Sequence, residues 1–285
     1  MHRSLTVEMA ARTDRGKRRE RNEDAYLVFR SGRFLERIQS NIAEEDLGSR
    51  FDPSGYLMAV ADGMGGAAGG EVASREALVE ALRLILLQPK WLLSLDDPDT
   101  RESDIRGFFE RTKLYVAGMH AALLRHASED PSVAGMGTTV TVAYSLGSDL
   151  FVVNVGDSRA YLFREGTIDH ITRDHTLAQS LADAGAIPQE EVPSHPDRHV
   201  LTRVVGGHGG WIRGDTHHVP LQPGDAVVVC TDGLTEVAED MEIARILAET
   251  PSSEAACASL IELALDRGAP DNVTVIVARY AAALA

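Results

Sequence analysis

The spacing of apolar residues along the chain alternates between the period of a strand and the period of a helix. Apolar positions alternate or run together over residues 5–11, 25–30 and 55–61, which predicts three strands. They then fall three and four positions apart over residues 71–87 and about 103–127, which predicts two amphipathic helices.

The second half of the chain begins with a meander of short antiparallel strands, from Thr138 to about Asp174, with Gly and Asp at the turns. The remaining pattern predicts, in order, a helix near 176–184, a loop-rich stretch to about 215, a strand at 225–232, helices near 239–248 and 252–267, and a last strand at 272–280. Strand blocks separated by helix pairs do not match a parallel βαβ alternation. We therefore expect an α+β fold, with antiparallel sheets covered by helices, in a single domain over residues 1–285.

Composition narrows the classes of partner. The formal net charge of -15 and the pI near 5.1 argue against nucleic acid or an anionic membrane surface, because both attract basic proteins. Cys230 and Cys257 are too few for a disulfide framework, and no apolar stretch has the length of a membrane span or of a signal-peptide core. These features predict a cytoplasmic protein with no nucleic-acid and no membrane partner.

Acidic residues stand where apolar runs end. Asp62 lies in VADGMGG, and Asp-Gly after an apolar run is typical of a tight turn as well as of a metal or phosphate site. The same placement recurs at Asp157 and Asp232, whereas Asp271 precedes an apolar run and the pair Glu23 and Asp24 opens a strand. Taken singly, each acid is more often a turn residue. Together they favour a hard divalent cation, which prefers several oxygen ligands and also relieves the repulsion between carboxylates.

Two neighbouring features leave alternatives open. Gly63 could turn its carbonyl toward a cation, or the glycines after Asp62 could simply let the next helix pack near the strand. Arg19 offers a bidentate fork for phosphate oxygens, but it also belongs to a basic run, RGKRRER, that could be a solvated segment.

Eight ordered segments resemble the motifs of bacterial metal-dependent serine/threonine phosphatases of type 2C, the PPM family. They are TDRGKRRERNEDA, VADGMGG followed by GEVAS, MGTTVTVA, VGDSRAYLFREG, ITRDHTLAQSL, HPDRHVLTRVVGG, LQPGDAVVVCTDGLTE and GAPDNVTVIVAR, and they extend from about residue 6 to 280. The resemblance implies a central sandwich of two antiparallel sheets flanked by helix pairs, in α/β/β/α layers, with a binuclear Mn or Mg centre at one end.

The resemblance also implies roles for individual residues. Asp62 would bridge the two metals, with Asp232 and Asp271 completing one and Glu23 plus the Gly63 carbonyl completing the other. Asp157 would help to hold a third, weaker ion. Asp24 would hydrogen-bond a water at the metals, and Arg19 would bind the substrate phosphate. Asp24 and Arg19 are the expected catalytic residues.

The chain departs from the family pattern at several positions. Eukaryotic relatives have a histidine where Met64 stands, so the general acid stays unassigned, and many bacterial relatives have a histidine where Ala67 stands. Residues 31–54 look like an insertion, in which Phe34, Ile38 and Ile42 predict a short amphipathic helix. It is interpreted as a surface elaboration in preference to a partner-docking element. The family carries a mobile flap over the substrate, expected here at about 177–210.

These features predict an enzyme of signal transduction that hydrolyses phosphoserine and phosphothreonine in proteins, by two Mn2+ or Mg2+ ions and an activated water. The implied partners are phosphorylated proteins and a cognate serine/threonine kinase, and the chain is expected to be a monomer. Two alternatives are a catalytically silent, phosphoprotein-binding regulator on the same fold, and a phosphatase of small regulatory domains in stress-response partner switching. Retention of all the acids favours the active enzyme over the first, and the ITRDHT and LTRVVGG segments favour the kinase-opposing type over the second.

Overall fold

A computed structural model describes residues 5–32, 55–65, 69–87, 95, 98–207, 210 and 212–283. The strands are β1 (Leu5–Asp14), β2 (Asp24–Ser31), β3 (Gly55–Met64), β4 (Gly137–Thr138), β5 (Val140–Leu146), β6 (Asp149–Val155), β7 (Arg159–Arg164), β8 (Thr167–His170), β9 (Val205–Gly206), β10 (Asp215–Pro220), β11 (Ala226–Cys230) and β12 (Val273–Ala282). The helices are α1 (Gly69–Leu87), α2 (Pro98–Glu129), η2 (Pro131–Val133), α3 (Leu177–Asp183), η3 (Gln189–Ser194), α4 (Asp232–Thr235), α5 (Asp240–Glu249) and α6 (Ser253–Asp266).

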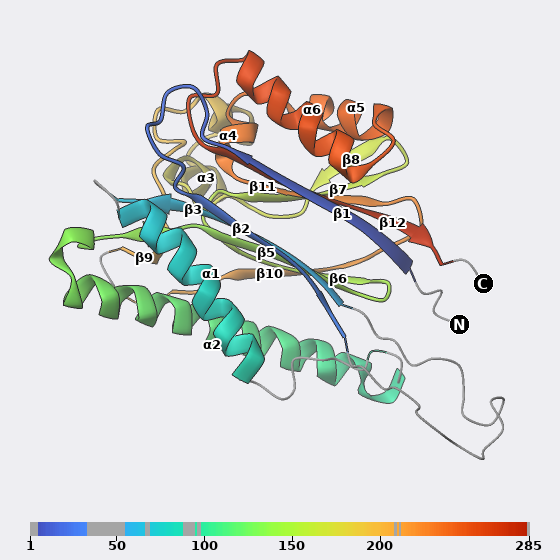
Figure 1. Ribbon diagram of the computed structural model, residues 1–285, viewed down its shortest axis with the longest axis horizontal. Helices are drawn as coiled ribbons and strands as arrows, with labels where there is room; N and C mark the ends of the chain where they lie inside the picture. The colour runs from blue at the N-terminus through green and yellow to red at the C-terminus, as the bar shows by residue number, and fades with distance from the viewer. Residues whose placement is uncertain are drawn as a thin grey trace.

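The strands form two antiparallel sheets that pack face to face. One sheet has the order β1-β12-β11-β7-β8. The other has the order β10-β6-β5-β3-β4-β9, with β2 paired to β3. Helices α1 and α2 cover the outer face of the second sheet, and α5 and α6 cover the outer face of the first (Figure 1). The predicted α+β sandwich with flanking helix pairs is confirmed.

Alternating side chains on the central strands explain why their sequences read as continuous apolar runs. In β12, Val275 and Val277 pack against the helices on one face, whereas Ile276 and Ala278 pack between the sheets. Because side chains alternate across a strand, both faces of this strand are buried and both must be apolar. Cys230 and Cys257 belong to the helix-covered core as buried free thiols, and burial raises the pKa of each to about 12. Neither cysteine is therefore set up as a nucleophile at neutral pH.

Several boundaries differ from the sequence prediction. Helix α2 begins at Pro98 instead of about 103, and α1 begins at Gly69 instead of 71. The elements β9, β10 and α4 had no counterpart in the predicted pattern. The predicted helix around Phe34, Ile38 and Ile42 lies outside the described residues. None of the described helices is long and apolar enough to cross a membrane.

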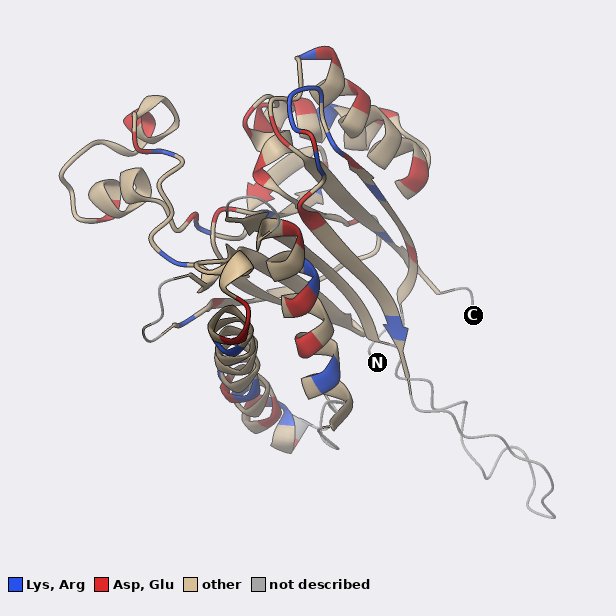
Figure 2. Cartoon of the chain, turned by 60° about the vertical axis from the view of Figure 1, so that its left-hand side comes forward, with Lys and Arg blue, Asp and Glu red and all other residues tan. Residues whose placement is uncertain are grey.

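The segment that holds α3 and η3 projects from the sandwich (Figure 2). The helix α3 begins at an N-cap, where the Thr176 side chain accepts a hydrogen bond from the backbone N–H of Gln179 at 3.2 Å. Such caps satisfy one of the free N–H groups of the first turn and fix where a helix starts. The helix predicted near 176–184 is confirmed at this place.

Candidate metal centre

The alternation of side chains in β3 carries Asp62 into the space between the sheets. Met58 and Val60 pack in the apolar layer between the two sheets, and Asp62 is the next residue on that face. Asp24 lies directly opposite Asp62 in the pairing of β2 with β3. Residues opposite each other in an antiparallel pair share a face, so both carboxylates lie at one end of the inner layer.

The other sheet brings two more acids to the same end. Asp232 follows β11 directly, and Asp271 precedes β12, which is the antiparallel neighbour of β11. The end of one strand therefore lies beside the start of the other. Asp157 joins them from the turn between β6 and β7, because its charge acts on both Asp62 and Asp232.

Burial and mutual repulsion dominate the electrostatics of these acids. Burial is the largest cause that raises the pKa of Asp62 and of Asp232 well above the ordinary aspartate range, and the charge of a neighbouring aspartate adds to each. Burial likewise raises the pKa of Asp24 and of Asp157 to about 7. Carboxylates in such a position lack a positive partner at neutral pH, and a bound cation would supply it.

Unpaired oxygens also point to a cation. Among the described residues, Oδ1 of Asp24 and Oδ1 of Asp232 are buried and have no hydrogen-bond partner. The second oxygen of Asp24 accepts hydrogen bonds from the hydroxyls of Thr231, at 2.9 Å, and Thr274, at 2.7 Å. The carboxylate is thus held in one orientation with a free oxygen. Oxygen-only donors of this kind fit Mg2+ or Mn2+.

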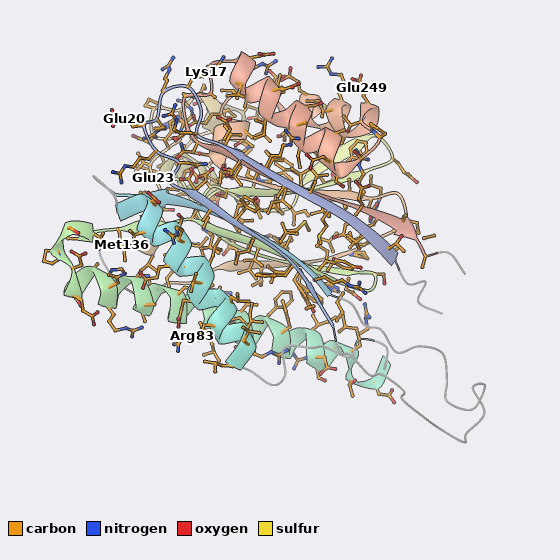
Figure 3. The ribbon with its side chains drawn as sticks, in the orientation of Figure 1. Lys17, Glu20, Glu23, Arg83, Met136 and Glu249 are labelled. Carbon is orange, nitrogen blue, oxygen red and sulfur yellow. The ribbon has the colours of Figure 1, made fainter. Side chains whose placement is uncertain are left out.

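The glycines after Asp62 serve close packing. Strand β3 continues through Met64, so Asp62-Gly63 is not a hairpin turn, and a Cβ on Gly63 would lie 2.0 Å from the carbonyl oxygen of Gly70. A Cβ on Gly70 would lie 2.7 Å from Cδ of Glu23. Figure 3 shows Glu23 beside the first turn of α1. Of the two alternatives left open for these glycines, the approach of the next helix to the strand has direct support.

Glu23 is fixed mainly through its backbone. Its carbonyl oxygen accepts hydrogen bonds from the Ser74 hydroxyl, at 2.6 Å, and from the N–H of Gly63, at 3.2 Å. Its own N–H donates to Oδ1 of Asn272, at 2.8 Å. Partial burial raises the pKa of Glu23 above its usual value. These bonds hold Glu23 between α1 and the start of β12, next to the aspartates.

The basic loop is attached to the site. Asn272 donates hydrogen bonds to the carbonyl oxygens of Arg15 and Arg21, each at 2.8 Å, and so anchors the loop beside β12. Nη2 of Arg19 lies 2.5 Å from Oδ2 of Asp271, while half of the Arg19 side chain stays exposed. Arg19 is therefore not part of a freely solvated run. Its guanidinium lies beside the acids with one side open to solvent.

Two further residues at the site were missed by the sequence reasoning. Potential ligand atoms of His199, Asp232 and Glu236 lie within 4.8 Å of one another, and Nδ1 of His199 is 3.0 Å from Oε1 of Glu236. Glu236 stands four residues after Asp232 around the short helix α4, which is a spacing that sequence could have revealed. His199 comes from the loop after η3, and no local pattern connects it to the acids. Met64 is 40% exposed, whereas Ala67 lies outside the described residues.

This chain is similar to known serine/threonine phosphatases. The serine/threonine protein phosphatase PstP of Mycobacterium tuberculosis is 35% identical over 275 residues, which are 96% of this chain and 45% of that protein. This chain thus spans less than half the length of that relative. The serine/threonine phosphatase stp of Listeria welshimeri is 30% identical over 266 residues, with 93% of each chain covered.

A solved structure of the PstP catalytic domain, in complex with two manganese ions, superimposes with a TM-score of 0.73 at 31% identity. The match covers 98% of this chain and all of that one. Residues 36–265 match the family model described as Protein phosphatase 2C. The chain therefore belongs to the protein phosphatase 2C family.

Proposed function

We propose that this chain is a metal-dependent phosphatase that hydrolyses phosphoserine and phosphothreonine in proteins. The observation that carries the proposal is the set of buried carboxylates at one end of the sandwich, in which Asp24 and Asp232 each keep an oxygen that is unpaired within the described residues, with Arg19 beside them. The Listeria relative, which is covered almost end to end, bears the name of a serine/threonine phosphatase and supports the same activity.

We propose that two Mn2+ or Mg2+ ions are held by a set of oxygen donors, namely Glu23, Asp62, the Gly63 carbonyl, Asp232 and Asp271. Asp157 would contribute to a third ion, for which Glu236 is a further candidate. When bound, two such cations lower the pKa of a shared water and stabilise charge that develops at phosphorus. The manganese in the PstP structure supports this choice of ions.

Asp24 and Arg19 would position the reactants. Asp24 is held by Thr231 and Thr274 through one oxygen, so its other oxygen is free to accept a hydrogen bond from the attacking water. Arg19 would bind two oxygens of the substrate phosphate, because a guanidinium presents its donors in a planar fork. Its contact with Asp271 orients the fork in advance.

We further propose that the segment at about 177–210 is a flap over the substrate, because it projects beside the site and carries His199 (Figure 2). In this proposal, residues 1–285 form one domain with an insertion at about 31–54, and the protein is a monomer. It acts in the cytoplasm on phosphorylated proteins and opposes a serine/threonine kinase. The buried free cysteines are consistent with a reducing compartment.

The direct test replaces one ligand while leaving the fold intact. Asp232→Asn keeps the shape of the side chain but removes its charge, and we expect phosphatase activity on a phosphothreonine peptide to fall at least about a hundredfold. Residues that merely support a metal ligand already contribute about 10- to 100-fold. The control is Asp169→Asn, an exposed aspartate of β8, which should keep full activity. Full activity in a folded Asp232→Asn protein would refute the assignment.

A further inference from the structure

A separate cavity lies between the seven-stranded sheet and the two helices that cover it. Its volume is about 500 Å3. Side chains of β2, β3, β5 and β6 form its floor, and α1 and α2 form its roof. Most of the lining is apolar, as in Leu57, Val142, Leu82 and Phe108. Small-molecule sites typically have volumes of about 300–1,000 Å3 and are lined in this way.

Among the described polar side chains that line the cavity, two on α2 have a buried atom without a hydrogen-bond partner. Arg111 and Tyr115 stand four residues apart, which places them on one side of the helix. Nη2 of Arg111 and the hydroxyl of Tyr115 are buried and have no hydrogen-bond partner within the part of the chain that the structure describes. Burial raises the pKa of Tyr115, and the charge of Arg111 acts in the opposite direction, so the two groups lie close together. Both are donors at neutral pH.

The apolar lining and the two unpaired donors together indicate the chemistry of the ligand. Buried donors without an acceptor are costly, most of all when the donor is charged. An apolar cavity left empty is also unfavourable, and the cost grows with its volume. A guanidinium fork beside a hydroxyl matches a carboxylate, and the apolar remainder matches a hydrocarbon chain. A single molecule with a carboxylate and a hydrocarbon chain would supply an acceptor for the donors and would fill the cavity.

We propose that this cavity binds a long-chain carboxylate, with its carboxyl group on Arg111 and Tyr115 and its hydrocarbon chain between the sheet and the helices. Entry is at the end where Leu86 of α1 lines the cavity, because that side chain is 68% exposed. The site does not depend on the metal centre, since none of the candidate ligands lines the cavity.

The test measures binding of palmitate to the delipidated full chain by isothermal titration calorimetry, with palmityl alcohol as the uncharged comparison. We expect saturable binding of one palmitate per chain and weaker binding of the alcohol. Arg111→Gln should weaken palmitate binding roughly ten- to hundredfold, because a hydrogen bond between charged groups is lost. The same variant should leave binding of the alcohol within about threefold, because the hydrocarbon contacts remain.

Arg106→Gln is the matched control, because Arg106 is on the same helix with a side chain that is 73% exposed. It should bind palmitate like the unaltered chain. If Arg111→Gln does not fold, Tyr115→Phe tests the same contact and should weaken palmitate binding several-fold. The proposal is overturned if the full chain does not bind palmitate saturably, or if a folded Arg111→Gln protein binds it as tightly as the Arg106→Gln control.

Discussion

Asp62 and Asp232 are buried next to each other, and neither has a positive side chain as its main partner. Two such carboxylates are destabilising unless a proton or a cation neutralises them. The buried, repelling pair, with Oδ1 of Asp232 left without a hydrogen-bond partner among the described residues, therefore makes sense as a set of ligands and not as a structural contact. The same reasoning separates them from Asp225, whose buried carboxylate is fully satisfied by the guanidinium of Arg164 at 2.7 and 2.8 Å.

His175 gives a residue-scale prediction about pH. Its Nδ1 accepts a hydrogen bond from the N–H of Gly156, at 3.0 Å. The ring therefore cannot bind a second proton, at Nδ1, without breaking that bond. Burial is the largest cause that lowers the pKa of His175, and the charge of Arg203 adds to it, against the opposing effect of Asp215. Below the ordinary histidine pKa of about 6.5, the unfolded chain therefore binds more protons than the folded chain.

Protonation of His175 in the unfolded chain therefore reduces the free energy of unfolding as pH falls from about 7.5 to about 5.5. His175→Gln should reduce this loss by up to about 1 kcal/mol, measured by urea unfolding at both pH values. His126→Gln is a control of opposite sign, because Glu76 raises the pKa of His126 and that pair stabilises the folded chain at the lower pH. An identical pH dependence in His175→Gln and the unaltered protein would contradict this account.

At the scale of elements, the first turn of α1 links the helix to the site. Gly70 leaves room for Glu23 and for the carbonyl oxygen of Gly63, which a Cβ would meet at 2.7 and 2.8 Å. The helix can therefore lie directly against two of the proposed ligands. A substitution here acts on the site through the position of a helix and not through a change of charge.

Gly70→Ala should raise the Mn2+ concentration for half-maximal activity about tenfold or more, because Glu23 or the Gly63 backbone must shift. The matched control is Gly107→Ala in α2, where the nearest atom to a new Cβ is the end of the flexible Arg111 side chain at 3.3 Å. That variant should keep its Mn2+ dependence and gain about 0.5–1 kcal/mol in stability from the better helix former. Unchanged Mn2+ dependence in Gly70→Ala would show that the close approach is not needed.

The elements also show where sequence reasoning succeeds and where it stops. The long helices and central strands were predicted because their burial imposes a regular period over many residues. The early start of α2 was missed because the residues after Pro98 are polar, although Pro is favoured in a first turn. β9 and α4 were missed because two and four residues are too short to show a period, and β10 was missed because its sequence, DTHHVP, has too few apolar residues to show one.

At the scale of the whole molecule, the face-to-face packing of the two sheets forms the site. Strand ends from both sheets meet at one end of the inner layer, so acids that are far apart in sequence become neighbours. The ordered motifs made Glu23, Asp24, Asp62, Asp232 and Asp271 predictable as a group. His199 was not predictable, because its contact with Glu236 depends on how a loop folds back over α4.

The central claim is that the acid cluster is a metal centre for phosphate hydrolysis. The measurement that tests it most directly is phosphate release from a phosphothreonine peptide by the purified chain, with Mn2+ titrated in after chelation. We predict release that rises saturably with Mn2+ and vanishes when the chelator is restored. A chain that is folded by circular dichroism yet releases no phosphate at any concentration of Mn2+ or Mg2+ would contradict the account and favour a silent phosphoprotein-binding regulator.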